Sequence, residues 1–299
     1  MNEEVLSRRD VHGVITDKIA AAIETGANSY QMPWHRSLTR PMNASTGKPY
    51  HGGNVVALWA TATAKGFRTS YWATYRQWRM LGAQVRKAER DAVIVFYKAA
   101  EPEGESRQNG SEKPPGQPRT IARASWAFNA DQVEGWTLPK PMLRTEVETR
   151  ENVEAFIAAI RADVRHGGDM ACYDPTGDYI AVPYPEQFIG TETSSATESY
   201  YSVLLHELTH WTGAEKRLAR NMRGRFGDDA YAMEELIAEL GAAFLCADLG
   251  IANEPRLDHA SYVSSWLRVF SKDKTALFTA ANKASVAATY LGHLAAPGA

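Results

Sequence analysis

The sequence predicts an α+β fold with two domains, a small α+β domain over residues 1–135 and a mainly helical domain over residues 136–299. Three observations support this prediction. The length of 299 residues is enough for two domains of ordinary size. The strongest β-branched runs lie before residue 135, whereas long segments of helical periodicity follow it. Positive charge is also concentrated in the first part of the chain.

In the first domain, three segments have helical spacing or helix-terminus signals: 4–25, 54–65 and 74–81. Two runs rich in β-branched and aromatic residues predict strands: 91–99 and 120–130. Residues 30–53 are rich in Pro, Gly, Asn and Ser, which indicates loop or hairpin structure. The segment 101–119 has no apolar side chain except its prolines, and we expect a flexible loop between the two strands.

We place the domain boundary near residues 135–148. In the second domain, the apolar spacing predicts one short strand over 178–188, interrupted by Pro183. Four segments predict helices: 148–163, 197–212, 229–249 and 260–290, the last with a break near Lys272.

The composition excludes several classes of protein. A hydrophobic content of 44% and a charged content of 23% are typical of a folded chain. No run of about 18 apolar residues is present, so no transmembrane helix is expected. The first residues lack an apolar signal segment, and two cysteines cannot form a disulfide framework. We therefore expect a cytoplasmic protein with no membrane partner.

A basic segment with many aromatic residues lies in the first domain. Residues 34–98 contain 11 Lys and Arg but only two acids, a net charge of +9, and the rest of the chain carries −11. Cations neutralise phosphates, and aromatic rings stack on unpaired bases with about 1–3 kcal/mol per base. Together they favour single-stranded nucleic acid over duplex. The alternative is that half of these aromatic residues form a core and that the cations form a solvated face.

No recognition helix, zinc finger or RNP signature is present, which argues against sequence-specific reading of a duplex. The candidate nucleic-acid contacts are cationic and aromatic residues of this basic segment: Trp34, Arg36, Arg40, Lys48, Lys65, Arg68, Tyr71, Trp72, Arg76, Trp78, Arg79, Arg86 and Lys87.

The most specific motif is H-E-x-x-H within LLHELTHWTG at residues 204–213. On a helix, His206 and His210 lie on one face, one turn apart. Two imidazoles in this arrangement bind Zn²⁺, and Glu207 between them can act as the general base toward the attacking water. Ser195 and Glu198 have the spacing of a helix capping box, which supports a helix here. The alternative is a pair of unrelated surface histidines.

A catalytic zinc needs a third protein ligand. The apolar helix expected over 229–249 carries Glu235 and Glu239 on one face, and Glu234 about 100° away. Carboxylates in such an apolar helix need a partner that offsets their desolvation, and a metal with its histidines would supply one. We predict Glu235 as the third ligand and Glu239 as the acceptor for a ligand imidazole N–H. The reverse assignment, and a solvated acidic face, remain the alternatives.

A tyrosine near such a site could supply a phenol that polarises a carbonyl or stabilises an oxyanion. Tyr200, Tyr201 and Tyr262 are the candidates, and the sequence does not choose among them.

The chain resembles the ArdC antirestriction proteins of conjugative plasmids, and also the N-terminal region of TraC-type conjugative primases. The resembling segments span nearly the whole chain and include RRDVHGVITDKIAAAIETG, PMNASTGKPYHGGN, SYWATYRQW, WAFNADQ, YYSVLLHELTHWTGAEKRLAR and YAMEELIAELGAAFLCADLG. The resemblance implies a single-stranded-DNA-binding domain followed by a zincin-like metallopeptidase domain. In gluzincin peptidases the third zinc ligand is the first Glu of an E-x-x-x-D/E pair, which corresponds to Glu235 with Glu239 here. The length of the polar segment 101–119 departs from this resemblance.

These observations predict an antirestriction protein that binds single-stranded DNA without strong sequence preference and carries one Zn²⁺ per chain. The expected protein substrate is unidentified, and a host restriction component is one candidate. The first alternative is a DNA-coating or decoy protein whose zinc site is latent. The second is a purely structural zinc site, and the third is a metal-dependent nuclease.

Overall fold

The structure is a computed structural model that describes residues 11–26, 39–99, 120–139, 145–190, 194–222, 228–252 and 259–296. Its α-helices are α1 (Val11–Gly26), α2 (Gly53–Lys65), α3 (Tyr75–Met80), α4 (Glu146–Ile160), α5 (Ala196–Thr212), α6 (Asp229–Leu249), α7 (His259–Lys272) and α8 (Ala276–Ala295). Its strands are β1 (Met42–Asn43), β2 (Tyr71–Ala73), β3 (Gln84–Val85), β4 (Ala92–Ala99), β5 (Thr120–Asn129), β6 (Val133–Glu134), β7 (Asp163–His166), β8 (Cys172–Asp174) and β9 (Tyr179–Val182).

The first half of the chain is built on a four-stranded sheet with the order β1-β2-β5-β4. Strands β4 and β5 form a long antiparallel hairpin, in register from Ala92 opposite Ala127 to Ala99 opposite Thr120. Helix α2 lies beside β4, and the Asn54 side chain fixes it there by donating to the Val95 carbonyl and accepting from the Val95 N–H, both at 2.8 Å. Strands β3 and β6 form a separate two-stranded sheet next to α3.

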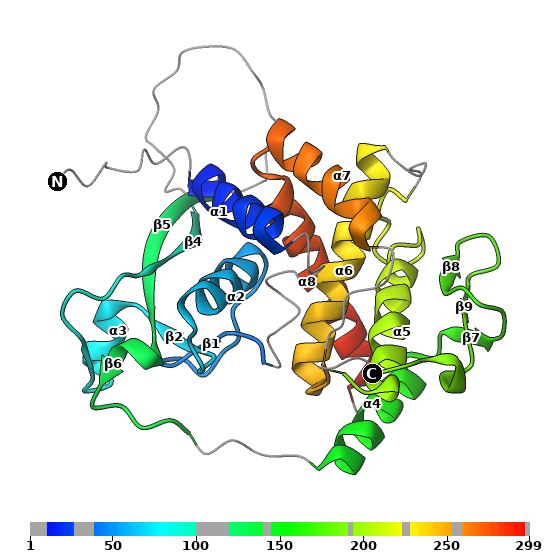
Figure 1. The fold of residues 1–299 in the computed structure, drawn as a ribbon, viewed down its shortest axis with the longest axis horizontal. Coiled ribbons are helices and arrows are strands. Elements are labelled where there is room, and N and C mark those ends of the chain that lie inside the picture. Colours follow the sequence, from blue (N-terminus) through cyan, green and yellow to red (C-terminus); the bar gives the residue numbers. More distant parts are fainter. Residues whose placement is uncertain are drawn as a thin grey trace.

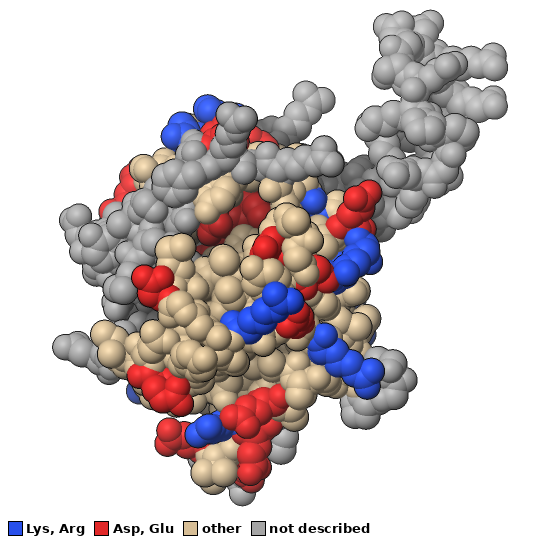
Figure 2. Space-filling model, turned by 90° about the vertical axis from the view of Figure 1, so that its right-hand side faces the viewer, with Lys and Arg blue, Asp and Glu red and all other residues tan. Residues whose placement is uncertain are grey.

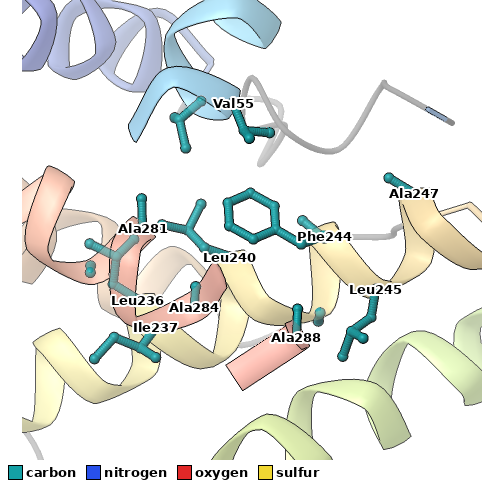
Figure 3. Packing of buried hydrophobic residues seen from close by; sticks show 14 of the residues in the cluster. Val55, Leu236, Ile237, Leu240, Phe244, Leu245, Ala247, Ala281, Ala284 and Ala288 are labelled. Atoms are coloured by element: carbon teal, nitrogen blue, oxygen red, sulfur yellow. The ribbon is translucent and has the colours of Figure 1, made fainter. Parts of the chain in front are cut away.

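Helix α6 is the centre of the second half, and most of its side chains are buried. It packs against α5, α7 and α8. Figure 3 shows Leu240 and Phe244 of α6 lying between Val55 of α2 on one side and the small side chains of α8 on the other. The Trp59 ring of α2 lies 5.7 Å from the Phe244 ring, centroid to centroid.

The two halves of the chain share one hydrophobic core, which includes buried side chains from α1, α2, β4, α5, α6 and α8. Polar contacts also cross between the halves. Thr16 donates to the Lys274 carbonyl at 2.7 Å, and the buried Ser285 hydroxyl accepts from the Gly52 N–H at 2.8 Å. Helices α1 and α2 are therefore part of the same packed body as α6 and α8 (Figure 1).

A small three-stranded sheet with the order β7-β9-β8 lies beside α5. Strand β9 pairs in parallel with β7 and antiparallel with β8, so β8 is an edge strand. This sheet is at the right of Figure 1 and supplies one wall of the site described below.

The α+β fold is confirmed, with the second half mainly helical. The helix predicted over 54–65 is α2, and the strands predicted over 91–99 and 120–130 are the hairpin of β4 and β5. The long helix predicted over 260–290 is interrupted after Lys272 and forms α7 and α8. The segment 101–119 and the start of the helix predicted over 4–25 lie outside the described residues. None of the described helices is both long and apolar enough to cross a membrane.

Candidate metal centre

Helices α5 and α6 bring two imidazoles and a carboxylate together. His206 Nε2 and His210 Nε2 are 3.1 Å apart. The two oxygens of Glu235 lie 3.6 Å from His206 Nε2 and 3.5 Å from His210 Nε2. All three side chains are buried, and one donor atom from each lies within 4.8 Å of the others. The three residues predicted as metal ligands therefore converge on one point.

The close approach of the two helices depends on a small residue in α6. A Cβ atom on Gly241 would lie only 2.5 Å from Thr209 Cγ2 of α5. Helix α5 itself begins as predicted, because Ser195 and Glu198 form a reciprocal capping box. The N-cap of α6 is Asp228, whose side chain accepts from the Tyr231 N–H at 2.7 Å. The N-terminal ends of both helices are thus defined by side-chain caps.

The Nδ1 atom of each imidazole faces a further carboxylate, but only that of His210 is within hydrogen-bond distance of it. Glu239 Oε2 lies 3.7 Å from His206 Nδ1, on the side that was predicted, but this is longer than a hydrogen bond. His206 Nδ1 has no hydrogen-bond partner among the described residues. Glu234 Oε1 lies 3.2 Å from His210 Nδ1. This contact of Glu234 was not predicted, because Glu234 is turned away from Glu235 and Glu239 on the helix.

Arg220 fixes the position of Glu234 and was also missed. Its guanidinium donates to Glu234 Oε2 at 3.1 Å and Oε1 at 2.7 Å, and also to the Thr209 carbonyl at 2.7 Å. Arg220 reaches this place from the turn after α5. A Cβ atom on Gly213 would lie 2.8 Å from an Arg220 nitrogen, so a larger residue there would displace the guanidinium. Only the fold brings Arg220 and Glu234 together.

Burial and charge act in opposite directions on these groups. Burial raises the pKa of the Glu235 carboxyl, but the adjacent His206 and His210 outweigh it and hold that pKa below its usual range. Burial also raises the pKa of Glu234, and contacts with His210 and Arg220 reverse the effect. The site is therefore a buried group of ionised carboxylates beside imidazoles, which favours a cation.

The donor atoms fit a divalent metal ion. Two imidazole nitrogens and one carboxylate are the ligand set of many hydrolytic zinc sites, and Zn²⁺ accepts both kinds of donor. Glu234 is matched by Arg220, but no Lys or Arg pairs with Glu235 in the part of the chain that the structure describes. The unmatched charge of Glu235 is what an ion between the two rings would offset.

A cleft opens beside these residues. Glu207, which is 2% exposed, lines it together with His210, Glu234 and Glu235. Its other walls are mostly apolar or aromatic: Ala171, Cys172, Tyr173, Pro175, Met222 and Tyr231. In Figure 2, which faces the side of the β7–β9 sheet, red Asp and Glu residues lie recessed behind tan neighbours.

The β8 wall of the cleft is held by Arg217. The Arg217 guanidinium pairs with Asp178 and donates to the Tyr173 hydroxyl at 3.0 Å. It also lies 3.8 Å from the centroid of the Trp211 ring. These contacts join the β8–β9 turn to the C-terminal end of α5, so the cleft wall and the histidine helix form one rigid unit.

Tyr200 and Tyr201, two of the tyrosines proposed from the sequence, do not line this cleft. Tyr200 contacts His166 Nε2 at 2.9 Å, and Tyr201 donates to Glu154 at 2.8 Å. The side chain of Tyr262 lies outside the described residues. The tyrosines that line the cleft are Tyr173 and Tyr231, one from an edge strand and one from the start of α6.

The predicted DNA contacts divide into four groups, one of which is buried. Seven cations are exposed: Lys48, Lys65, Arg68, Arg76, Arg79, Arg86 and Lys87. Tyr71 is half-buried, and its ring lies 5.3 Å from that of Trp136. Trp34 and Arg36 lie outside the described residues.

Three of the predicted DNA contacts are corrected by the structure. Trp72 and Trp78 are 1% and 0% exposed and belong to the core. Arg40 is also buried, 3.2 Å from Asp248 and over the Phe244 ring. The aromatic rings and the guanidinium stabilise packing here, so none of the three presents a surface to DNA.

Two family models match the chain. Residues 9–128 match the N-terminal domain of the anti-restriction factor ArdC, and residues 151–283 match a zincin-like metallopeptidase. The crystal structure of the metal-free antirestriction ArdC protein from plasmid R388 is similar at 39% identity, covers 96% of this chain and 98% of its own, and has a TM-score of 0.77. Its Mn(II)-bound structure is similar at 37% identity, with coverage of 96% and 99% and a TM-score of 0.73.

Two sequence relatives extend this comparison. An uncharacterized protein, y4eC, of Sinorhizobium fredii is 43% identical over 94% of this chain and 91% of its own length. The DNA primase TraC of Escherichia coli is 32% identical over 94% of this chain, which corresponds to 20% of the primase.

Proposed function

Because the chain belongs to the ArdC family of antirestriction proteins, we propose that it protects incoming conjugative plasmid DNA from restriction in the recipient cell. We assign single-stranded-DNA binding to residues 1–135 and a metal-dependent peptidase activity to residues 136–299. The two family models, which match on either side of residues 129–150, support this division.

The observation that carries the peptidase proposal is the convergence of His206, His210 and Glu235 on one point, where His210 and Glu235 line one cleft with Glu207. We propose that these three residues hold one divalent ion per chain. A metal ion bound there would act as a Lewis acid toward a peptide carbonyl. We propose Zn²⁺ because of the donor set, and the Mn(II)-bound relative makes Mn²⁺ the competitor to test.

Other residues of the chain would transfer the proton, orient the histidines and exclude water. The Glu207 carboxylate lines the cleft and would accept a proton from the attacking water, then pass it to the leaving amine. Glu234 would fix His210 through its Nδ1 atom, and Glu239 faces the same atom of His206. The apolar walls of the cleft would exclude bulk water from the reacting groups.

The DNA-binding proposal is supported by the seven exposed cations of the first half. Cations that face solvent can neutralise phosphates at any sequence, so the proposed binding has little sequence preference. The second candidate function, a DNA-coating protein whose metal site is structural or latent, is favoured by the deep burial of the three metal-facing side chains between α5 and α6.

The Glu207→Gln variant distinguishes the two candidates. It keeps the shape of the side chain and leaves His206, His210 and Glu235 in place, so metal content should remain one per chain. If the peptidase works in antirestriction, transfer of a plasmid into a restricting host should lose its protection, while binding of single-stranded DNA persists. The exposed Glu215→Gln change on the turn after α5 is the matched control. Full protection by the Glu207→Gln variant would establish the DNA-coating function instead.

A further inference from the structure

An open groove lies on the first half of the chain, far in sequence from the candidate metal centre. It is formed where α3, β3 and β6 meet the end of β5. Its walls contain two aromatic rings and two cations among eight residues: Tyr75, Gln84, Val85, Arg86, Lys87, Glu89, Phe128 and Glu134.

Tyr75 is the exposed ring of this groove, and it is held in place. The side chain is 45% exposed, although it begins a helix whose other aromatic residue, Trp78, is fully buried. The Tyr75 ring stands at 69° to the Phe128 ring, with the centroids 6.5 Å apart. Its hydroxyl accepts from Gln84 Nε2 at 3.2 Å. A large ring that is oriented on one side and open to solvent on the other is suited to stacking.

The support beneath Tyr75 is rigid. Trp78 donates through Nε1 to the Phe128 carbonyl at 3.0 Å and contacts Trp136 edge-on, with centroids 5.1 Å apart. Thr74 and Gln77 form a reciprocal capping box at the start of α3. Stacking on Tyr75 would therefore require little ordering of the protein.

The charges around the groove favour an anion. Arg86 pairs with Glu89 at 2.7 Å, and Gln132 also donates to Glu89, so this carboxylate is already matched. Within the described part of the chain, no ion pair is formed by three exposed cations nearby: Arg76, Arg79 and Lys87. On α3, Arg79 is one turn from Tyr75 and from Arg76. Glu134 is the one further carboxylate of the groove.

The second half of the chain differs in this respect. Most of its described cations have carboxylate partners, as for Arg150, Arg165, Lys216, Arg217, Arg220, Arg268 and Lys272. Figure 2, which faces this half, shows blue side chains next to red ones. Among the described residues, exposed cations without an ion pair are thus commoner in the first half than in the second, and Arg76, Arg79 and Lys87 belong to this group.

We propose that this groove is a subsite for one unpaired base of a single-stranded nucleic acid. The base stacks on Tyr75 against the wall formed by Phe128 and Gln84, and Arg76, Arg79 and Lys87 contact the phosphates on either side. The proposal of this subsite rests on the proposed single-stranded-DNA binding and gives the position at which one base is held. Stacking uses the face that every base has, so the subsite tolerates any sequence.

The test compares two strands of equal length, a labelled oligothymidylate and the same backbone without bases. Fluorescence anisotropy measures the affinity of each for the full chain. The Tyr75→Ala variant should bind the oligothymidylate about 5- to 150-fold more weakly and the abasic strand equally well. Its salt dependence should not change, because the phosphate contacts remain. Tyr75→Phe keeps the ring and should retain the affinity of the original chain.

Tyr184→Ala is the matched control, since Tyr184 is a 54% exposed aromatic residue of the second half. Tyr75→Leu is a second variant that keeps an apolar side chain but no aromatic face. Circular dichroism and the thermal midpoint of each variant show that it is folded.

The outcomes separate the subsite from the proposed function. If the original chain binds neither strand, the proposed DNA binding is wrong, and the subsite with it. If it binds tightly and the Tyr75 variants bind equally tightly, DNA binding stands and the subsite is overturned. Trp126 on β5 is a second exposed ring, at 47%. If Trp126→Ala lowers the affinity for the oligothymidylate and the Tyr75 variants do not, the base is held on the β4–β5 hairpin and the subsite is overturned.

Discussion

The carboxylate of Glu234 lies 3.2 Å from Nδ1 of His210, while Glu235 faces Nε2 of the same ring at 3.5 Å. Two adjacent residues of α6 therefore contact opposite nitrogens of one imidazole. The first orients the ring, and the second shares the point at which a metal ion would be held.

We predict that Glu234→Gln weakens metal binding by about 10- to 100-fold, because the amide orients and polarises the His210 ring less than a carboxylate does. Arg220→Gln should cause a smaller loss, since Glu234 remains but loses its guanidinium support. Competition with a chelator measures both affinities. Arg150→Gln, an exposed ion pair on α4, is the control. An unchanged affinity in Glu234→Gln would show that this contact does not support the metal.

We predict that His206→Ala reduces the bound metal from one ion per chain to none, because a single imidazole and one carboxylate are too few ligands for tight zinc binding. Metal analysis of the purified protein measures the stoichiometry. His293→Ala changes an exposed histidine of α8 and should leave it at one. A stoichiometry of one in His206→Ala would mean that the ligands have been wrongly assigned.

We predict that Gly241→Ala destabilises the protein by about 1–3 kcal/mol, because the new methyl group would overlap the Thr209 side chain. It should also weaken metal binding by moving α5 and α6 apart. Gly292→Ala in α8 is the matched control. Nothing lies within 4 Å of a Cβ at that position, so this change should stabilise the helix by about 0.5–1 kcal/mol. Urea unfolding measures both, and equal effects would refute the close-packing argument.

We predict a pH-dependent effect at Asp178. Hydrogen bonds from Arg217 hold the pKa of the Asp178 carboxyl below its usual range. Because the pKa of this carboxyl is lower in the folded chain than in the unfolded one, its ionised form stabilises the fold at any pH above the ordinary Asp pKa of about 3.9. This stabilisation is lost as the pH falls below that value toward the folded-state pKa. Asp178→Asn should therefore cost about 1.5–3 kcal/mol at pH 7 and progressively less below about pH 4. Asn tolerates the φ of 54° found at this position.

Thermal unfolding of the Asp178→Asn variant and the original chain, from pH 7 to the lowest pH at which both are folded, provides the measurement. Asp163→Asn is the control, because its partner Arg165 is exposed and such pairs contribute little. A difference between variant and original chain that stays constant with pH would contradict the ion-pair explanation.

We predict that the triple change of Arg76, Arg79 and Lys87 to Gln lowers the slope of log affinity for single-stranded DNA against log salt by about 2, at roughly 0.7 per phosphate contact. The matched control is the triple change of Arg150, Arg165 and Lys272 to Gln, which removes the same charge from paired positions. If both triple variants change the slope equally, the effect is one of net charge and not of this surface.

The periodicity of apolar residues predicts the long helices of this chain but not its short strands. Helices α2, α5 and α6 follow from continuous apolar spacing with recognisable ends. Strands of two to four residues such as β1, β3 and β7 do not, since so few residues give no alternation to read. Their pairing is set by contacts with segments distant in sequence.

The candidate site shows the same division. Helical geometry places His206 and His210 on one face and puts Glu235 and Glu239 together on another helix, and the structure brings Glu235 to the two histidines. Arg220 and Glu234 could not be found this way, because their contact joins a turn to a different helix. Trp72 and Trp78 were misassigned because an aromatic residue beside cations has the same sequence pattern whether it stacks on a base or fills a core.

Helix α6 carries Glu235 at one level and, two to three turns later, the Phe244 ring that packs against Trp59 of α2. A fragment beginning after residue 135 would expose that apolar surface to water. It would also lose the partner on which Asp248 depends. A hybrid that joins the first half of one relative to the second half of another should therefore fold only when its α2 and α6 surfaces match. The two halves are not interchangeable modules.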